Sequence, residues 1–391
     1  MFRSRTDATF PAPIVASRRW LDGVTFPPER PLINLSQAAP VNPPPAPLRQ
    51  AMADYLLSVP QAHLYGPVLG MEELRAELAA QISRHYDGSV ATGQVAITSG
   101  CNEAFAATIA ALTTEGDEVI LPTPWYFNHK MWLDMAGVRT VPLPTGPDLL
   151  PDPERAAALI TPRTRAIVLV TPNNPSGAEY PGGLLRAFHD LAQARGLTLI
   201  VDETYRDFDS RSGAPHALFC DPDWDRSFVH LYSFSKAYRL TGHRVGALVG
   251  APELMLRVEK FLDTVTICPS QIGQFAALTG LRTLGDWVAS ERLEILDRRA
   301  ALAEGFGRLA NRGWRLKGLG AYFAYVEHPF DIESEALAKR LVHDAGILLL
   351  PASMFVPADD ASGRRHLRIA FANTDRAGIA EVVGRLAALP D

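Results

Sequence analysis

Between residues 90 and 250, short apolar runs alternate with longer stretches in which apolar residues recur every three or four positions. The short runs are typical of buried strands and the longer pattern of amphipathic helices. Repeated strand–helix units predict a mostly parallel sheet that helices cover on both faces. The seven predicted strands are 95–98, 118–121, 138–143, 166–170, 197–201, 228–232 and 245–249, and the predicted helices among them are 101–112, 125–135, 154–160 and 182–195.

The same patterning divides the chain into three parts. Residues 1–45 are rich in proline and weakly patterned, which predicts an arm with extended pieces, part of it joined to a small domain, and one short strand at 32–35. Residues 46–285 are predicted to form a large domain that begins with helices at 46–57 and 71–86. Residues 286–391 are predicted to hold a linking helix at 286–311 and a small α+β domain. Its strands are expected at 314–316, 322–326, 347–350 and 367–370, and its helices at 334–345 and 375–388.

Composition narrows the class of function. Of the 391 residues, 47% are hydrophobic and 21% charged, which allows a sizeable core and argues against disorder. The net charge of −5 argues against nonspecific nucleic-acid binding and against a basic membrane-binding patch. The three cysteines are widely spaced, and no apolar run is long enough for a signal peptide or a membrane span. We expect a soluble, cytoplasmic protein with no nucleic-acid or membrane partner.

Polar side chains follow several of the predicted strands, at the edge where an open parallel sheet binds its ligands. The first group is the turn Ser99-Gly100-Cys101-Asn102, between a strand and a helix. Free N–H groups at the start of a helix bind phosphate, whereas Ser99 or Asn102 could equally serve only as a helix cap. The turn lacks the GK[ST] sequence of a Walker loop.

Two further polar groups lie after the next strands of the sheet. Asn174 belongs to a Pro-Asn-Asn-Pro loop, which is explained either by turn chemistry or by an amide held toward a ligand. Asp202 follows a buried strand, where a carboxylate needs a partner such as a protonated pyridine nitrogen or a metal. We expect no metal, because no cluster of His or Cys accompanies Asp202. Histidines without ligand spacing, interpreted as structural or surface residues, include His63, His129, His243 and His366.

A lysine and two arginines complete the set of reactive groups. Lys236 lies in the stretch Ser233-Phe234-Ser235-Lys236 after a predicted strand, and Arg244 follows eight residues later. A lysine in a desolvated pocket beside a cation loses its proton readily, which suits a Schiff base with a phosphorylated aldehyde. Taken alone, the stretch is more typical of a solvated surface lysine. Arg368, within the apolar strand 367–370, either binds a carboxylate or extends outward from a strand edge.

In this combination and order, the motifs resemble the pyridoxal-phosphate enzymes of fold type I, and specifically the class I and II aminotransferases. The resemblance covers residues 32–372. It implies a large domain that binds pyridoxal phosphate on a mostly parallel seven-stranded sheet between helices, with a smaller α+β domain beside it. It also implies transfer of the amino group of an L-amino acid to a 2-oxo acid by a ping-pong mechanism. The same resemblance implies a homodimer whose active sites are shared between the chains.

Carried over by position, the resemblance implies catalytic and substrate-binding roles. Lys236 holds the cofactor aldehyde as a Schiff base and then moves the proton. Asp202 pairs with the ring nitrogen, and Tyr205 and Asn174 contact the ring hydroxyl oxygen. Arg368 binds the α-carboxylate of the substrate, and Asn174 and Ala38 also belong to the substrate site.

The resemblance implies further roles in holding the cofactor. Tyr126, two residues after Pro124, stacks on the ring, with Trp125 as the alternative. Tyr65 reaches the phosphate in the neighbouring subunit. The phosphate is further held by Ser99, Gly100, Cys101, Asn102, Ser233, Ser235 and Arg244.

Two positions depart from the family pattern. Ala38 stands in Leu-Ser-Gln-Ala-Ala-Pro, where the family has a glycine near the substrate, which could change the floor of the pocket or the preferred reaction. Cys101 replaces a commoner small residue in the phosphate turn. Together with Ala38, residues 10–14, Tyr322 and Phe323 are expected to line a pocket that suits apolar or aromatic amino acids.

Other functions compete with amino transfer. The same motifs would hold the cofactor for a C–S β-lyase or for another reaction at the substrate Cα. A non-catalytic regulator that binds pyridoxal phosphate is disfavoured, because such proteins usually carry a DNA-binding segment and this chain is acidic. A nucleotide-binding Rossmann enzyme is also disfavoured, since no GxGxxG sequence follows a strand.

Overall fold

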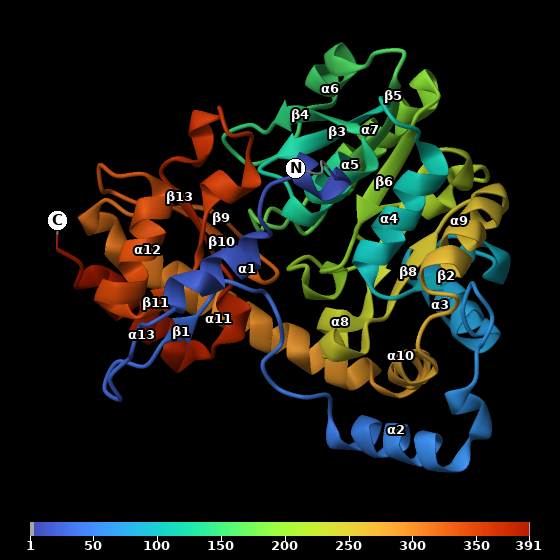
Figure 1. Cartoon of the computed structure of the whole chain (residues 1–391), viewed down its shortest axis with the longest axis horizontal. Helices are drawn as coiled ribbons and strands as arrows, with labels where there is room; N and C mark the ends of the chain where they lie inside the picture. The colour runs from blue at the N-terminus through green and yellow to red at the C-terminus, as the bar shows by residue number, and fades with distance from the viewer. Residues whose placement is uncertain (1–3, 391) are drawn as a thin grey trace.

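A computed structural model describes residues 4–390 and shows a large α/β body joined to a smaller α+β body (Figure 1). Seven strands form the large sheet in the order β2-β8-β7-β6-β5-β3-β4, and only β8 runs antiparallel to its neighbours. This confirms the predicted fold class. The strands are β2 Val95–Thr98, β3 Glu118–Thr123, β4 Arg139–Pro144, β5 Thr164–Val170, β6 Thr198–Asp202, β7 Phe228–Ser233 and β8 Gly246–Val249.

Helices cover both faces of the large sheet because alternate side chains of each strand point to opposite faces. In β5, for example, Ile167 and Leu169 belong to one core and Ala166 and Val168 to the other. The first core also holds α3 Glu72–His85, α6 Pro153–Leu159, α7 Gly182–Arg195 and α10 Gln271–Thr283, and α2 Ala46–Ser58 packs outside α10. The second holds α4 Cys101–Leu112, α5 Phe127–Ala136 and α9 Pro252–Val265.

The long helix α11, Gly285–Leu309, leads from the large body into the smaller one (Figure 1). There a sheet with the order β12-β13-β10-β9 packs its apolar face on α11, α12 and α13. The elements are β9 Arg315–Gly320, β10 Phe323–Glu327, α12 Ser334–Ala345, β11 Ile347–Leu348, β12 Leu350–Pro351, β13 His366–Ile369 and α13 Arg376–Ala387.

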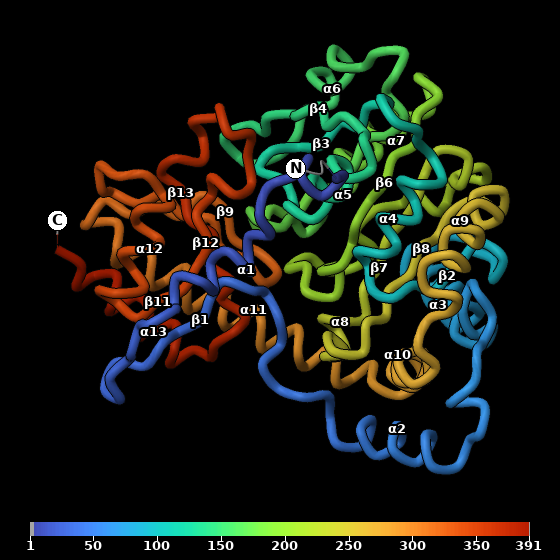
Figure 2. The backbone as a smooth tube through the Cα atoms, viewed as in Figure 1, coloured from blue at the N-terminus to red at the C-terminus, as the bar shows by residue number. Residues whose placement is uncertain are grey.

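The N-terminal segment runs along the smaller body before it reaches α2 (Figure 2). Its strand β1, Ile33–Asn34, pairs in parallel with β11. The arm also contains a helix that was not predicted, α1 Pro13–Arg18. Pro13 occupies the first helical turn, where a missing N–H loses no hydrogen bond, so this proline starts a helix.

Two helices of the large body, α9 and α10, were not predicted from the sequence. The short helix α8, Phe234–Ala237, follows β7 directly and carries the lysine of the Ser-Phe-Ser-Lys stretch. Among residues 4–390, no helix combines the length and the apolar composition that crossing a bilayer requires.

Candidate active site

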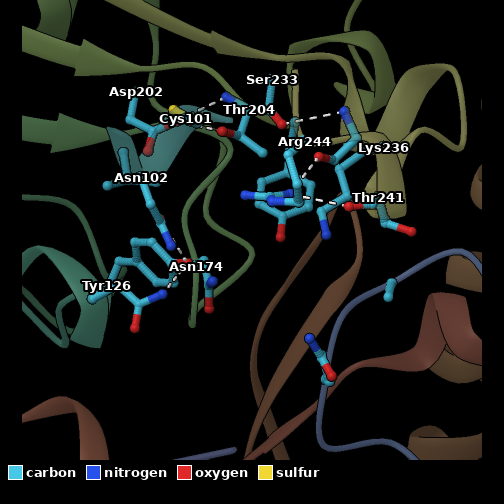
Figure 3. A pocket seen from close by; sticks show the side chains of 16 residues that line it. Cys101, Asn102, Tyr126, Asn174, Asp202, Thr204, Ser233, Lys236, Thr241 and Arg244 are labelled. Carbon is cyan, nitrogen blue, oxygen red and sulfur yellow. Dashed lines mark hydrogen bonds between the residues drawn. The ribbon is translucent and has the colours of Figure 1, made fainter. Parts of the chain in front are cut away.

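A cavity of about 370 Å³ lies at the edge of the large sheet where β5, β6 and β7 end. These strands are parallel neighbours, so their carboxyl ends bring distant parts of the chain together. The start of α4, the region around the start of α5 and the N-terminal segment supply the other walls. The lining residues are Gln37, Ala39, Cys101, Asn102, Tyr126, Asn128, Val170, Asn174, Asp202, Thr204, Tyr205, Ser233, Ser235, Lys236, Thr241 and Arg244 (Figure 3).

Lys236 is held at this cavity by the short helix α8. Ser233 caps the helix, its hydroxyl oxygen accepting a hydrogen bond from the N–H of Ser235 at 3.2 Å. The Lys236 Nζ donates to the backbone carbonyl of Ala38. Removal from water, together with the guanidinium groups of Arg244 and Arg368, lowers the pKa of Lys236 to about 8. A substantial fraction of this amine is therefore neutral near pH 8, which a solvated surface lysine would not be.

Asp202 ends β6 with its carboxylate only 3% exposed. Its Oδ1 accepts two hydrogen bonds from Thr204, one from the N–H at 3.0 Å and one from Oγ1 at 2.7 Å. The His129 Nε2 lies 3.2 Å from Oδ2. Burial alone would raise the pKa of Asp202, but the contacts with His129 and Thr204 outweigh it and lower that pKa below its ordinary value. Asp202 is therefore a carboxylate at neutral pH, as pairing with a protonated ring nitrogen requires.

His129 is a residue of this site that sequence reasoning missed. It is buried on α5 and stacks on Phe105 with ring centroids 3.9 Å apart. It was interpreted as a structural or surface residue, and its position facing the Asp202 carboxylate was not predicted. The available signal was the spacing to Leu133, four residues on, which places both side chains on the buried face of α5.

The phosphate turn at the start of α4 is closely packed against Arg244. Gly100 has φ +89°, and a Cβ added there would lie 2.3 Å from the Arg244 Nη2. A Cβ at Gly246 would lie 2.5 Å from the Cys101 nitrogen. The two glycines thus allow a helix start and a guanidinium to meet. The N–H groups of Cys101 and Asn102, in the first turn of α4, have no acceptor within the helix, so this turn and Arg244 together suit an anion.

The serines of the predicted phosphate site differ in position. Ser233 and Ser235 both line the cavity, and the Ser235 Oγ accepts from the Arg244 Nη1 at 3.4 Å. Ser99 does not line it, and its N–H donates to the Glu103 carboxylate. Neither Ser99 nor Asn102 caps α4, whose N-cap is Gly100, so the capping alternative was wrong.

Tyr126 and Trp125 point to different cavities. The Tyr126 hydroxyl lies at the main cavity, where it accepts from the Asn128 Nδ2 at 2.9 Å and donates to the Asn102 Oδ1 at 3.3 Å. Burial, reinforced by the Asp202 charge, raises the pKa of Tyr126 to about 12. Trp125 lines a second cavity of about 860 Å³ beneath the N-terminal arm. Of these two neighbours, Tyr126 is therefore the one available to a ligand in the main cavity.

Arg368 extends from β13 of the smaller body toward the large one. Its side chain is 2% exposed, so the outward-pointing alternative was wrong. The Nη1 donates to the Asn174 Oδ1 at 3.0 Å, and the Nη2 donates to the Ser36 carbonyl. The guanidinium lies 5.2 and 5.0 Å from the ring centroids of Phe323 and Phe355. Burial lowers the pKa of Arg368 to about 10, and its Nε has no partner within residues 4–390.

Some predicted residues do not line the main cavity. Tyr65 is 80% exposed and lies away from the cavity of its own chain. The carbonyl of Ala38 accepts a hydrogen bond from Lys236, and neither Gly100 nor Arg368 is among the lining residues. Of the residues expected to line an apolar substrate pocket, residues 10, 11 and 13 line the second cavity, and neither Tyr322 nor Phe323 lines the main one.

These groups fit pyridoxal phosphate. The helix start with Arg244 suits its phosphate, and the glycines at 100 and 246 keep that turn free of a Cβ. The Asp202 carboxylate suits its ring nitrogen, and the Lys236 amine suits its aldehyde. Within the described part of the chain, no group of three or more His, Cys, Asp or Glu residues could hold a metal ion.

The sequence matches the family model of "Aminotransferase class I and II" over residues 30–386. The chain belongs to this family. It is 33% identical to an arginine–pyruvate transaminase of Pseudomonas aeruginosa over 83% of this chain and 81% of that protein. It is 31% identical to a valine–pyruvate aminotransferase of Mycobacterium tuberculosis over 87% of each. Aspartate aminotransferase from Thermus thermophilus, solved with maleate, superposes with a TM-score of 0.88 at 27% identity over 99% of each chain.

The predicted recognition, enzyme class and cofactor are confirmed by these comparisons. The aminotransferase transfers amino groups between amino acids and 2-oxo acids, and pyridoxal phosphate is its cofactor. The chain shares its fold with that aspartate aminotransferase over its full length. The cavity lies at the end of the parallel sheet of this fold.

Proposed function

We propose that this aminotransferase takes the amino group of an L-amino acid and passes it to a 2-oxo acid, in ping-pong order, at the cavity around Lys236. The observation that carries the proposal is the meeting of Lys236, Asp202 and Arg244 at one cavity. When bound, pyridoxal phosphate supplies the carbonyl carbon that accepts the amino group and a ring that withdraws electrons from the substrate Cα. The side chains of the chain supply binding, orientation and proton transfer.

The Lys236 Nζ takes the proton from the substrate Cα and returns it to the aldehyde carbon of the cofactor. Its lowered pKa supports this role, because a neutral amine can accept a proton. Asp202 holds a proton on the ring nitrogen, and Tyr205 and Asn174 contact the ring hydroxyl oxygen. Arg368 binds the α-carboxylate through its planar guanidinium and thereby orients the Cα–H bond.

The other side chains of the cavity hold the cofactor in place. Tyr126 stacks on the ring, a role that its position at the main cavity supports over Trp125. The phosphate is bound at the turn Ser99–Asn102, where Cys101 and Asn102 offer free backbone N–H groups, together with Ser233, Ser235 and Arg244. Burial and the Asp202 charge raise the pKa of the Cys101 thiol well above its usual range, so that thiol stays neutral.

The enzyme is proposed to be a homodimer in which Tyr65 reaches the phosphate of the partner subunit. Tyr65 is itself exposed, and so are several large apolar side chains, among them Leu57 at 88%. The segments 64–66 and 268–271 touch through a hydrogen bond from the Gln271 Nε2 to the Leu64 carbonyl at 3.3 Å. Leu64, Val265 and Ile267, which lie in or within a few residues of these segments, are also exposed. Exposed apolar side chains of this kind support an interface.

Two finer proposals concern location and acceptor. All three cysteines are free, which supports a reducing, cytoplasmic compartment. Pyruvate is proposed as an amino acceptor, because the two relatives cited above are named for pyruvate.

The test compares Lys236→Ala with the wild-type enzyme and with Lys130→Ala. Lys130 lies on α5 in an ion pair with Asp134, outside the main cavity, and serves as a matched control. With pyridoxal phosphate added, we expect Lys236→Ala to lose at least ~10³-fold in amino transfer and to lack the absorbance of the lysine-linked cofactor. Lys130→Ala should retain both. Turnover by Lys236→Ala at the wild-type rate would overturn the assignment.

The same assay separates the acceptors and the competing lyase reaction. Amino donors are screened against pyruvate and 2-oxoglutarate, and release of free ammonia is measured in parallel. We expect amino transfer to pyruvate and no ammonia without an acceptor. Transfer to 2-oxoglutarate alone would refute the choice of pyruvate, and stoichiometric ammonia would indicate elimination.

A further inference from the structure

Thr204 makes an unusual double contact with the carboxylate at the centre of the site. Its backbone N–H and its side-chain hydroxyl both donate to the same oxygen of Asp202, Oδ1, at 3.0 and 2.7 Å (Figure 3). Thr204 also lines the cavity, so its side chain lies at the wall that the cofactor would occupy. No catalytic role described above uses this residue.

The acceptor sites of Asp202 can be counted. Each carboxylate oxygen has about two lone-pair positions for a hydrogen bond. The two bonds from Thr204 fill those of Oδ1, while Oδ2 faces the His129 Nε2 at 3.2 Å. One position on Oδ2 is therefore left for an N–H donor from the cavity. Because the Thr204 hydroxyl occupies Oδ1, a ring N–H can form its hydrogen bond only with Oδ2.

We propose that Thr204 is a positioning residue that fixes the plane of the Asp202 carboxylate and leaves Oδ2 as the oxygen for the ring nitrogen of the cofactor. The inference rests on the proposed pairing of Asp202 with that nitrogen. With the backbone N–H alone, a single hydrogen bond on Oδ1 opposes rotation of the carboxylate about its Cβ–Cγ bond. The hydroxyl adds a second hydrogen bond to the same oxygen and restricts this rotation further.

The hydroxyl also acts on the charge of Asp202. A donor bonded to a carboxylate favours its ionised form, so loss of the hydroxyl makes the carboxylate more basic. A more basic carboxylate shares the proton of the ring nitrogen more evenly and weakens the positive charge on the ring. We therefore expect both the affinity for pyridoxal phosphate and the rate of proton removal from the substrate to depend on the hydroxyl.

Two substitutions separate the hydroxyl from the shape of the side chain. Thr204→Val keeps the branched shape and removes the hydroxyl, whereas Thr204→Ser keeps the hydroxyl and removes the methyl group. Far-UV circular dichroism and thermal melting of both variants check that they fold. The measured quantities are the dissociation constant of pyridoxal phosphate from the apoenzyme, kcat, and the KM of the amino donor.

For Thr204→Val we expect the dissociation constant to rise roughly tenfold and kcat to fall roughly tenfold, with KM changed less than about twofold. Thr204→Ser should stay within about twofold of the wild-type enzyme in all three. A Thr204→Val enzyme with wild-type cofactor affinity and kcat would overturn the proposal. Equal losses in Thr204→Ser and Thr204→Val would also overturn it, because packing of the methyl group would then be the cause.

Asp202→Asn distinguishes failure of this inference from failure of the function beneath it. If Asp202→Asn loses most of its kcat while Thr204→Val does not, Asp202 keeps its role and the role of Thr204 is refuted. If Asp202→Asn retains wild-type kcat and cofactor affinity, the pairing of Asp202 with the ring nitrogen is itself wrong, and the inference falls with it.

Discussion

Gly100 offers the sharpest test of the phosphate turn, because two separate features forbid a side chain there. Its φ of +89° lies in the region that glycine favours, and a Cβ would stand 2.3 Å from the Arg244 Nη2. The backbone strain in Gly100→Ala should destabilise the fold by about 1–3 kcal/mol. The Cβ should in addition push the guanidinium out of the turn, because real Cβ atoms do not approach other atoms so closely.

The second effect should appear in cofactor binding. A charge-assisted hydrogen bond contributes about 1.5–3 kcal/mol, so loss of the Arg244 contact with the phosphate should weaken pyridoxal phosphate roughly 10–150-fold. The assay is titration of the apoenzyme with the cofactor, followed by its absorbance, together with the free energy of unfolding of the apoenzyme from urea melts.

Gly116→Ala is the matched control for backbone strain. Gly116 has φ +85° but no atom within 4 Å of an added Cβ, and it lies in a turn before β3. We expect a similar loss of stability and unchanged cofactor affinity. If Gly100→Ala binds pyridoxal phosphate as tightly as the wild-type enzyme, or if Gly116→Ala loses the same affinity, the assignment of this turn to the phosphate is refuted.

Three further outcomes follow from the site. Because its guanidinium binds the α-carboxylate, Arg368→Ala should raise the KM of the amino donor ~100-fold while the affinity for pyridoxal phosphate changes less than about threefold. Equal effects on both quantities, measured by steady-state kinetics and cofactor titration, would contradict this role. The rate at which the apoenzyme forms its covalent bond with pyridoxal phosphate should rise between pH 7 and 9 with a midpoint near 8. The reason is that the pKa of Lys236 is lowered to about 8 and only the neutral amine reacts. A midpoint above 10, measured by stopped-flow absorbance, would show that Lys236 titrates as an ordinary lysine. Mixing inactive Tyr65→Ala and Lys236→Ala chains should restore roughly a quarter of the wild-type active sites. Half of the randomly formed dimers contain one chain of each kind, and one of the two sites in such a dimer is intact. If a refolded mixture recovers no activity, Tyr65 does not contribute to the partner's site.

The strands of the large sheet could be predicted closely because a strand buried on both faces is a continuous apolar run. The predicted strand 95–98 and helices 101–112, 182–195 and 334–345 coincide with β2, α4, α7 and α12. Prediction failed where the local sequence is compatible with two conformations. A proline-rich stretch suits an extended arm, yet Pro13 starts α1, and the amphipathic α9 and α10 were not singled out at all.

The sequence alone determined the chemical types in the site and their order. Lysine, aspartate, the amide loop and the glycine turn each follow a strand, and parallel strands bring their carboxyl ends to one edge. That rule needs no knowledge of packing, so Lys236, Asp202 and Asn174 could be placed together from the order of the elements. The family resemblance rests on the same order of motifs, which the match over residues 30–386 reflects.

Only the tertiary structure decided which side chains touch. Arg368 meets Asn174 across 194 positions of sequence, and His129 faces Asp202 from a different helix. Such contacts depend on how two bodies and several helices pack, which a local pattern does not encode. The two hydrogen bonds from Thr204 to Asp202 span only two residues, yet they too depend on the direction of the chain after β6. The sequence therefore determines which reactive groups are present, and the packing of the fold determines their pKa values and orientation.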